Sequence, residues 1–461
     1  MTLANSYDDW RSNAIAEDEN SGSLEWKNSD ETGRYDYRVI RRRYNELVEI
    51  RASGDPLRLL YYLNEGIHGN MGGMGATKLY TRAQFGTKTL VENYVAELVS
   101  ALNHLKGEDS GSIPQAQKTA YFRRARLCFG RSALMLSGAR ALGAFHLGVV
   151  KSMIEQNILP QVISGAGSGS FVAALIGTRT KEDLTTFLNS SDISDVLKFE
   201  ATEYSQRRID LHDLENLLVK IIPDMTFSEA FETSGFHINI SVAPKEAQQR
   251  SRLLNSITAP NALIRESIIA SCALPGVFPS VKLMAKDNNG KRQPYVPSRS
   301  WIDGSITDEL PTKRLARLYG VNHFISSQAN PLLLRNKGSS LGDESLVSRW
   351  VNIYQSASRQ WLRVLFPFAM EAIKEAYPLN ALARNWFSTA IQENSADINI
   401  LPTARYLRAS MFYDSLANNE SAELITDGER ATWPLIERIR INTAVSRCID
   451  DILNSLDEDF L

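Results

Sequence analysis

The alternation of apolar and polar residues divides the chain into a helical first part, a mixed middle part and a helical last part. Residues 1–33 are polar and acidic with Ser-Gly and Thr-Gly breaks, so we expect the extreme end to be mobile. Asp55 can cap a helix whose first position suits Pro56. Glycine-rich residues 66–75 predict a flexible loop, and residues 106–117 predict a polar linker. Apolar positions at helical spacing predict helices over residues 35–52, 55–64 and 89–105.

From Phe129 the pattern changes to short apolar strands that alternate with helices. Such alternation is typical of a layered α/β domain with a largely parallel sheet. The predicted strands cover residues 134–136, 162–163, 237–242, 301–302, 323–327 and 398–401. The predicted helices cover residues 144–156, 171–176, 181–188, 211–222, 261–271 and 311–319, with a hairpin turn at 286–290.

The last part turns helical again from Asp343 and ends in a predicted helix over residues 432–456. Within it, residues 350–377 are rich in aromatic and aliphatic side chains around Pro367. Two interpretations stay open for them, a core-packing helix that is kinked at Pro367 or an interfacial segment that dips into lipid. The whole pattern predicts a polar segment, a helical module, an α/β core and a helical tail, with bounds 1–33, 34–125, 126–335 and 336–461.

The most informative stretch is the one in which two apolar strands each lead through a small-residue turn into a helix, between residues 134 and 178. In the second turn, Gly165 and Gly169 stand where a G-x-S-x-G nucleophile elbow needs glycine, because the backbone there is strained and tightly packed. The central position is Gly167, which has no side chain and cannot attack an ester. Ser168 is the hydroxyl at the tip of the turn, but we expect it to point about one residue away from where the elbow aims. The pattern therefore predicts a serine-hydrolase scaffold without its nucleophile.

Asp303 is the second informative residue, because it lies between a predicted strand and a glycine at the sheet edge where α/β sites form. An Asp in such a turn often bonds only its own backbone, but beside an elbow it is a candidate general base. The turn over residues 137–143 is the candidate oxyanion hole, since N–H groups that open a helix can face a developing negative charge. In this turn Arg140 either binds an anionic head group or lies on the surface. His146 follows it, and we expect a packed or capping histidine rather than a catalyst.

Composition narrows the functional classes further. The 461 residues suffice for one large domain and a smaller one, and the net charge of −2 does not support a nucleic-acid role. Three separated cysteines without metal-ligand spacing indicate a reducing compartment. We expect no metal and no cofactor. The N-terminus lacks signal-peptide features and no uncharged apolar run approaches the ~18 residues that span a bilayer, so we expect a cytoplasmic protein, soluble or peripheral to a membrane. The basic run 41–43 indicates a solvated helix face, with a membrane-headgroup patch as the alternative.

On these motifs the sequence resembles the patatin-like lipid acyl hydrolases, in particular the branch of plant and yeast triacylglycerol lipases of lipid droplets and their bacterial relatives. The similarity runs from about Tyr35 to the end. It is carried by LMLSGxxxLGxFHLGVV, the ISGxxxGS turn, LLNSITAPNALIRESIIASCALPGVF, WIDGSITDELPTKRLARLYGVNHFISSQANP and TWPLIERIRI.

This resemblance implies a patatin-like three-layer α/β/α core, with a helical N-terminal module, a helical C-terminal tail and a Ser-Asp dyad that lacks histidine. Asp303 matches the aspartate of the dyad, and the dyad serine falls on Gly167. The oxyanion turn of the family usually reads S-G-G-A, and here it contains Gly138, Ala139 and Arg140.

We therefore expect a patatin-like protein that binds a lipid or acyl ester with little or no hydrolysis. One alternative is an active lipase or phospholipase that uses Ser168, or a water activated by Asp303. Another is a structural or partner-binding protein that regulates an active paralogue through its helical termini. The expected partner is a lipid or acyl ester at a membrane or lipid-droplet surface, with no nucleic acid, and the oligomeric state stays open.

Overall fold

A central seven-stranded sheet organises the molecule. The computed structural model describes residues 4–107, 112–138, 142–189, 211–246, 249, 251–273, 279–304, 310–329, 396–403 and 418–458. The strands of the sheet are β1 Arg131–Leu136, β2 Val162–Gly165, β3 His237–Pro244, β4 Arg252–Leu254, β7 Trp301–Asp303, β8 Val321–Ser327 and β9 Ile398–Ile400. Their order is β4-β3-β2-β1-β8-β9, and β7 also pairs with β3. The pairs from β3 through β9 are parallel, whereas β4 and β7 run antiparallel to β3.

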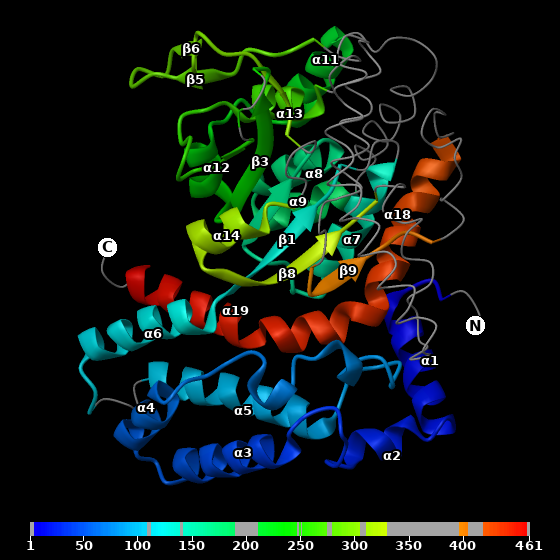
Figure 1. The fold of residues 1–461 in the computed structure, drawn as a ribbon, viewed down its shortest axis with the longest axis vertical. Coiled ribbons are helices and arrows are strands. Elements are labelled where there is room, and N and C mark those ends of the chain that lie inside the picture. Colours follow the sequence, from blue (N-terminus) through cyan, green and yellow to red (C-terminus); the bar gives the residue numbers. More distant parts are fainter. Residues whose placement is uncertain are drawn as a thin grey trace, which may run out of the picture.

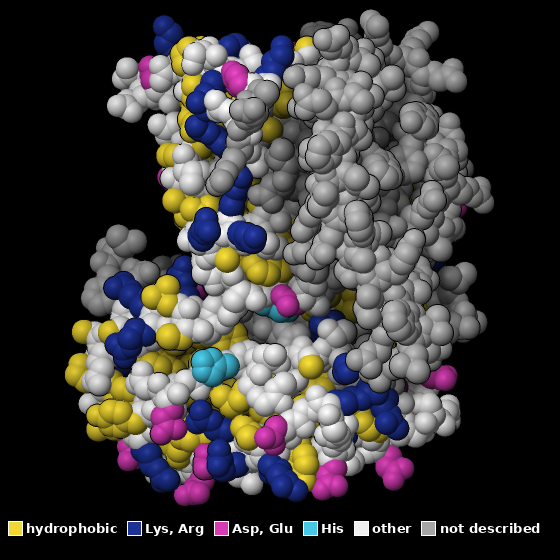
Figure 2. Space-filling model, viewed as in Figure 1, with side chains coloured by type: hydrophobic (Ala, Val, Ile, Leu, Met, Phe, Trp, Pro, Cys, Tyr) yellow, Lys and Arg dark blue, Asp and Glu magenta, His cyan; other side chains and the backbone are white. Residues whose placement is uncertain are grey.

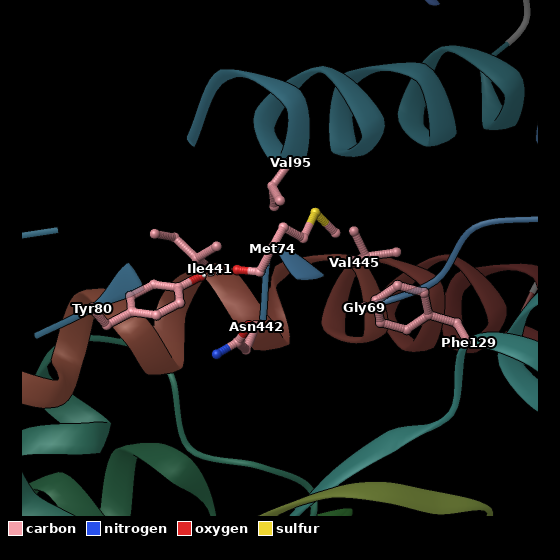
Figure 3. A pocket seen from close by; sticks show the side chains of 8 residues that line it. All are labelled: Gly69, Met74, Tyr80, Val95, Phe129, Ile441, Asn442 and Val445. Carbon is pink, nitrogen blue, oxygen red and sulfur yellow. Dashed lines mark hydrogen bonds between the residues drawn. The ribbon is translucent and has the colours of Figure 1, made fainter. Parts of the chain in front are cut away.

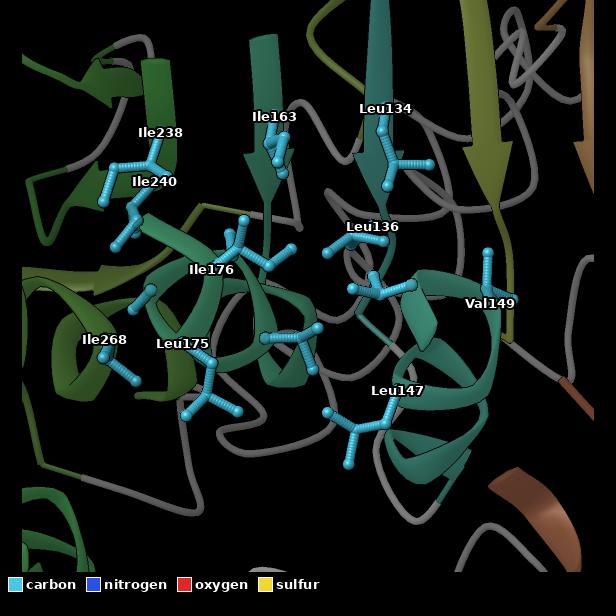
Figure 4. Close-up of a cluster of buried hydrophobic side chains, with 14 of the residues drawn as sticks. Leu134, Leu136, Leu147, Val149, Ile163, Leu175, Ile176, Ile238, Ile240 and Ile268 are labelled. Atoms are coloured by element: carbon cyan, nitrogen blue, oxygen red, sulfur yellow. The ribbon is translucent and has the colours of Figure 1, made fainter. Parts of the chain in front are cut away.

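Helices cover both faces of this sheet (Figure 1). Side chains alternate along β1, so Leu134 and Leu136 join a large core while Met135 joins a smaller core on the other face. The large core packs the sheet against α7 Ala144–Glu155, α8 Ser168–Gly177 and α13 Ile264–Cys272, as the apolar side chains in Figure 4 show. On the opposite face, α14 Thr312–Tyr319 buries Leu315. The core is thus the three-layer α/β/α arrangement that the resemblance implied.

Further helices complete the large core and its rim. They are α9 Lys181–Asn189, α11 Leu211–Ile221, α12 Phe227–Ser234 and α18 Asn418–Thr432. A hairpin of β5 Met284–Lys286 and β6 Arg292–Pro294 extends from this part, at the turn that the sequence predicted. Asp287 closes the hairpin, because its carboxylate accepts the backbone N–H groups of Asn289 and Lys291, each at 2.8 Å.

The N-terminal helices form a second hydrophobic core beside the first (Figure 1). They are α2 Ser23–Asn28, α3 Tyr37–Ala52, α4 Pro56–Asn64, α5 Thr89–Lys106 and α6 Gln115–Phe129, with short 3-10 turns η1 Met71–Gly73 and η2 Thr77–Leu79. Helix α1 Tyr7–Asn20 precedes them and packs on the first core instead, through Tyr7 and Trp10. After the turn η7 Trp433–Leu435, the last helix α19 Ile436–Glu458 lies between the two cores. It contributes Ile436 and Ile439 to the core around the sheet and Ile452 and Leu456 to the core of the N-terminal helices.

The first residues of the chain correct one expectation. We expected a polar and mobile end, but residues 7–28 are mostly helical. Tyr7 is buried in the large core, and its hydroxyl donates to Glu437 at 3.1 Å. Asp18 is buried as well. Its carboxylate is satisfied there, because it accepts the backbone N–H groups of Gln84 and Phe85 at 2.7 and 3.0 Å. Polar composition did not reveal these long-range contacts.

Two further outcomes concern single helices. The helix that begins at Pro56 is confirmed, and Asp55 caps it by accepting the N–H groups of Leu57 and Arg58, both at 3.0 Å. Helix α6 was missed, since the sequence predicted a polar linker over residues 106–117 and no element between that linker and Phe129. Among the helices in the described ranges, none has the length and apolar character that crossing a bilayer requires. The apolar segment 350–377 lies outside the described residues.

Candidate functional site

The tip of the β2–α8 turn has a backbone conformation that fits the predicted nucleophile elbow. Gly167 adopts φ 53° and ψ −128°, a conformation that L side chains rarely adopt. Its carbonyl oxygen accepts the backbone N–H and the hydroxyl of Ser170, at 2.9 and 2.6 Å, so the turn closes directly into the helix. The residue at the tip is therefore held in a sharp strand-to-helix turn.

The two flanking glycines are required by close backbone packing. A Cβ on Gly165 would collide with the carbonyl of Gly169, and a Cβ on Gly169 would collide with the carbonyl of Leu136. The N–H of Ala166 donates to the same Leu136 oxygen at 3.2 Å. The elbow is thus pressed against the end of β1, where the candidate oxyanion turn begins.

Gly167 differs from these two positions because it has room for a side chain. A Cβ built there would meet only the Cα of Gly138, at 3.4 Å, which is ordinary contact. Any side chain at position 167 would thus start beside the turn that follows β1. Gly138 is half-buried, while Ala139 and Arg140, the other predicted residues of the oxyanion turn, lie outside the described residues.

The start of that turn is fixed by three hydrogen bonds to Ser137. Its N–H donates to the carbonyl of Ser327 at 3.1 Å, and its hydroxyl accepts the N–H of Ala329 at 3.1 Å. Its carbonyl accepts Nε2–H of His146 at 3.0 Å, and Nδ1 of that ring lies 2.6 Å from the Ser327 hydroxyl. The ring is fully buried, so His146 is packed, as the sequence predicted, and it anchors the turn from behind.

Electrostatics agree with this role for His146. Complete burial lowers the pKa of His146 from 6.5 to about 4, because the charged ring would lose its hydration. A carbonyl oxygen can only accept, so Nε2 carries the proton and Nδ1 accepts from the Ser327 hydroxyl. The neutral ring therefore holds the turn in one tautomer.

Strand register brings Asp303 to the level of the elbow. Gly165 pairs with Ile240 on β3, and two residues further along β3 Val242 pairs with Asp303 on β7. The N–H of Asp303 donates to the carbonyl of Ala273 at 3.0 Å, and its side chain is buried. Gly304 follows with its Cα against the β3 backbone, where no Cβ would fit.

Ser271, near the end of α13, connects these parts and was missed from the sequence. Its hydroxyl accepts the N–H of Gly167 at 3.0 Å and donates to the carbonyl of Ser241 on β3 at 2.8 Å. Ser241 directly precedes Val242, the β3 residue that pairs with Asp303. Ser271 therefore links the strand beside Asp303 to the tip of the turn. Nothing in the local sequence distinguishes this serine, because its partners lie about 30 and 104 residues away.

The remaining candidates have simpler positions. Ser168 is the first residue of α8 and is half-buried. In the basic run, Arg41 pairs with Asp30 at 2.6 Å and Arg43 with Glu65 at 3.4 Å, whereas Arg42 is exposed. Within the described part of the chain, no group of three or more His, Cys, Asp or Glu residues could hold a metal ion.

A small apolar cavity lies elsewhere, between α19 and the N-terminal helices (Figure 3). Its volume is about 10 Å³, room for about one water molecule and far too little for an acyl chain. It is lined by Gly69, Met74, Tyr80, Val95, Phe129, Ile441, Asn442 and Val445. None of the predicted site residues contributes to it.

Two family models match parts of this chain. Residues 134–316 match the family model described as patatin-like phospholipase, and residues 1–127 match one described as a domain of unknown function, DUF3336. The chain is 31% identical to triacylglycerol lipase 4 of Saccharomyces cerevisiae over 98% of its own length and 52% of that protein.

Two further relatives carry similar names. Triacylglycerol lipase 5 of Saccharomyces cerevisiae is 28% identical, over 99% of this chain and 64% of that protein. Triacylglycerol lipase ptl3 of Schizosaccharomyces pombe is 27% identical, over 96% of this chain and 94% of that protein. The chain thus spans between half and two thirds of the two yeast proteins from Saccharomyces, and nearly all of the third.

Proposed function

Because the chain belongs to the patatin-like phospholipase family through residues 134–316, we propose that it binds lipid acyl esters with impaired or absent hydrolysis. One observation carries the proposal: the residue in the strained elbow conformation is Gly167, which has no nucleophilic side chain. Triacylglycerol is the ester that the names of the relatives point to. In this proposal the α/β core, residues 126–335, binds the ester, and the helical regions before and after it support that core.

The roles of the site residues follow from the same proposal. Gly167 stands where the dyad serine would attack, and Asp303 stands where the general base would accept its proton. The N–H groups of the turn that begins at Gly138 would face the ester carbonyl. Loss of the nucleophile in a covalent mechanism leaves only the small rate enhancement that binding and the oxyanion hole provide.

The first experiment is labelling with a fluorophosphonate, followed by mass spectrometry, on the native protein and on Gly167→Ser. We expect no labelled serine in the native protein and a label on the introduced serine of the variant. The substitution is sterically possible because a Cβ at position 167 meets only Gly138, at 3.4 Å. Its positive φ costs about 1–3 kcal/mol of stability, so thermal unfolding of the variant is measured in parallel.

Asp303→Ala in the Gly167→Ser background is the matched control. If Asp303 is the base, the introduced serine loses most of its label while the protein stays folded. A label on Ser168 of the native protein would contradict the proposal and establish an active serine hydrolase instead. Native turnover that survives Ser168→Ala but not Asp303→Ala would instead support a water activated by Asp303.

A non-catalytic regulatory role is tested by binding. We expect the native protein to bind a non-hydrolysable acyl ester analogue, and Gly167→Trp to weaken that binding by filling the space beside Gly138. If the analogue does not bind while a paralogous lipase is captured specifically, the partner-binding alternative replaces the proposal.

A further inference from the structure

Exposed cations gather on one side of the α/β core. Figure 2 shows Lys and Arg side chains in a band that runs from the end with the β5–β6 hairpin down to α14. Five exposed residues define this basic strip: Lys245 after β3, Lys282 and Lys291 around the hairpin, and Lys313 and Arg317 on α14. The strip is a feature of the tertiary structure, since its members come from three separate segments.

The charge of this region contrasts with that of the whole chain. Between residues 279 and 320 the sequence has eight Lys and Arg against four Asp and Glu, whereas the whole chain has 51 against 53. Two of these cations are neutralised locally, because Lys286 pairs with Glu229 and Arg292 with Asp224 and Glu266. Within the described residues, no ion pair involves any of the five residues of the basic strip. The strip therefore has an excess of positive charge that faces solvent.

Exposed apolar side chains lie at the hairpin end of the strip. Val219 on α11 is 61% exposed and Ile257, in the loop after β4, is 53% exposed. Val219 lies beside α13, because Arg265 of that helix donates to the Val219 carbonyl at 3.2 Å, and the next residue of α13, Glu266, pairs with Arg292 of the hairpin at 3.1 Å. Ile257 lies in a loop that contacts the hairpin, because the N–H of Lys286 on β5 donates to the carbonyl of Asn261 at 3.0 Å. Cations beside exposed aliphatic side chains are the combination that binds the interface of an anionic bilayer.

We propose that the basic strip is the surface by which this protein docks on an anionic phospholipid layer, with Val219 and Ile257 entering the interface. This inference rests on the proposed function, since it supplies the surface from which an acyl ester would reach the site. The strand β7, which carries Asp303, contacts two segments of the strip: Val281, next to Lys282, exchanges backbone hydrogen bonds with Trp301 at 2.9 and 2.8 Å, and the N–H of Lys245 donates to the carbonyl of Ser300 at 2.9 Å. Docking along the strip would therefore bring the strand of the candidate base to the lipid. The exposed aliphatic residues favour a lipid layer over a nucleic acid, which offers no apolar interior.

The experiment is sedimentation of the full chain with vesicles of phosphatidylcholine alone or of phosphatidylcholine mixed with phosphatidylserine. We expect binding to the mixed vesicles and little to the neutral ones, with affinity that falls as salt is raised. Each cation near an anionic surface contributes about a fivefold gain in partitioning. The variant with Lys245→Gln, Lys291→Gln, Lys313→Gln and Arg317→Gln should therefore bind at least about a hundredfold more weakly.

The control removes the same number of charges from the N-terminal helices. Arg38→Gln, Arg42→Gln, Arg123→Gln and Arg124→Gln together change net charge equally but leave the strip intact, since all four side chains are exposed on α3 and α6. Equal weakening by both variants would overturn the proposal, and so would tight binding to a DNA duplex without binding to mixed vesicles. A second variant, Val219→Ser with Ile257→Ser, should weaken vesicle binding without changing its salt dependence.

These outcomes are separable from the proposed function. Vesicle binding depends on headgroup charge, and occupancy of the site is measured with the soluble ester analogue. If the strip variant retains analogue binding but loses vesicle binding, both proposals stand. If the native protein does not bind the analogue but still binds vesicles in a charge-dependent way, the ester-binding function is rejected and the proposed docking surface stands.

Discussion

Three histidines that are largely removed from water make the free energy of unfolding depend on pH. Burial lowers the pKa of His146, His237 and His323 from 6.5 to about 4 in each case, because each ring is largely removed from water. Between these pH values the unfolded chain binds protons that the folded chain does not. The free energy of unfolding should therefore be retained above pH 6.5 and fall as pH decreases toward 4, by about 1.4 kcal/mol per pH unit for each histidine. Urea denaturation across this range measures the slope.

His146→Gln tests the part of this slope that belongs to the candidate oxyanion turn. In the variant, the slope of the free energy of unfolding against pH should be smaller by about 1.4 kcal/mol per pH unit, because glutamine does not bind a proton when the chain unfolds. His68→Gln, at an exposed residue, controls for the removal of an imidazole as such. An unchanged slope in His146→Gln would mean that His146 is already accessible to protons in the folded protein.

The residues of the candidate site differ in how well sequence could reveal them. Gly167 and Asp303 stand in short motifs whose glycines the backbone itself requires, and the structure brings their strands to the same level through β3. Ser271 has no such motif, because its hydrogen bonds join α13 to β3 and to the elbow. Local patterns therefore revealed Gly167 and Asp303, whereas only the packed fold revealed Ser271, which links their surroundings.

At the scale of helices, α7 is positioned by an unusually close contact with α18. A Cβ on Gly148 would collide with the carbonyl of Ile425, and a Cβ on Gly428 would collide with the carbonyl of Phe145. Gly148→Ala must therefore separate the two helices or shift their backbones. We expect a net loss of about 1–3 kcal/mol in the free energy of unfolding, despite the better helix propensity of Ala.

Thermal and urea unfolding of Gly148→Ala measure this loss. Gly33→Ala is the control, since nothing lies within 4 Å of a Cβ at that position. Because α7 begins directly after the candidate oxyanion turn, the variant should also weaken labelling in the Gly167→Ser background. A Gly148→Ala protein as stable as Gly33→Ala would show that the two helices separate without cost.

Helices whose signals are local were predictable, and helices stabilised by distant contacts were not. The start of α4 follows from Asp55 and Pro56, which act on their own first turn. Helix α6 buries Phe122 and Phe129 in the core of the N-terminal helices. Helix α1 is fixed through Asp18 and Tyr7, whose partners lie more than 60 residues away. Their polar composition is typical of loops, so the sequence alone favoured the wrong structure.

At the scale of the whole molecule, the last helix joins the α/β core to the N-terminal helices. In addition to its apolar contacts, α19 presents Asp450 to the first residue of β1. Arg131 Nε donates to Asp450 at 3.0 Å, and Arg131 Nη2 donates to Gln161 at 2.7 Å. Arg126 of α6 approaches the same carboxylate at 3.4 Å. One carboxylate of the last helix thus connects to α6 and β1, which lie more than 300 residues earlier in the chain.

Burial makes this ion pair sensitive to the loss of either partner. Burial raises the pKa of Asp450 and lowers the pKa of Arg131, and the attraction between the two groups opposes both shifts. Asp450→Asn leaves the Arg131 guanidinium, which is 4% exposed, without its counter-charge. We expect a loss of about 3–5 kcal/mol in the free energy of unfolding, measured by urea denaturation. Glu49→Gln, which breaks the exposed pair with Arg58, should change stability by less than ~0.5 kcal/mol.

The double variant Arg131→Met with Asp450→Leu separates the cost of an unpaired charge from the need for this contact. Replacing both charges by apolar groups of similar volume should restore most of the stability that Asp450→Asn loses, because no buried charge is then left unpaired. Fluorescence of the seven tryptophans and circular dichroism report whether both cores still unfold together. If the double variant unfolds in two separate transitions, the ion pair itself couples the cores. If it unfolds in one transition at near-native stability, the apolar contacts of α19 are sufficient to couple them.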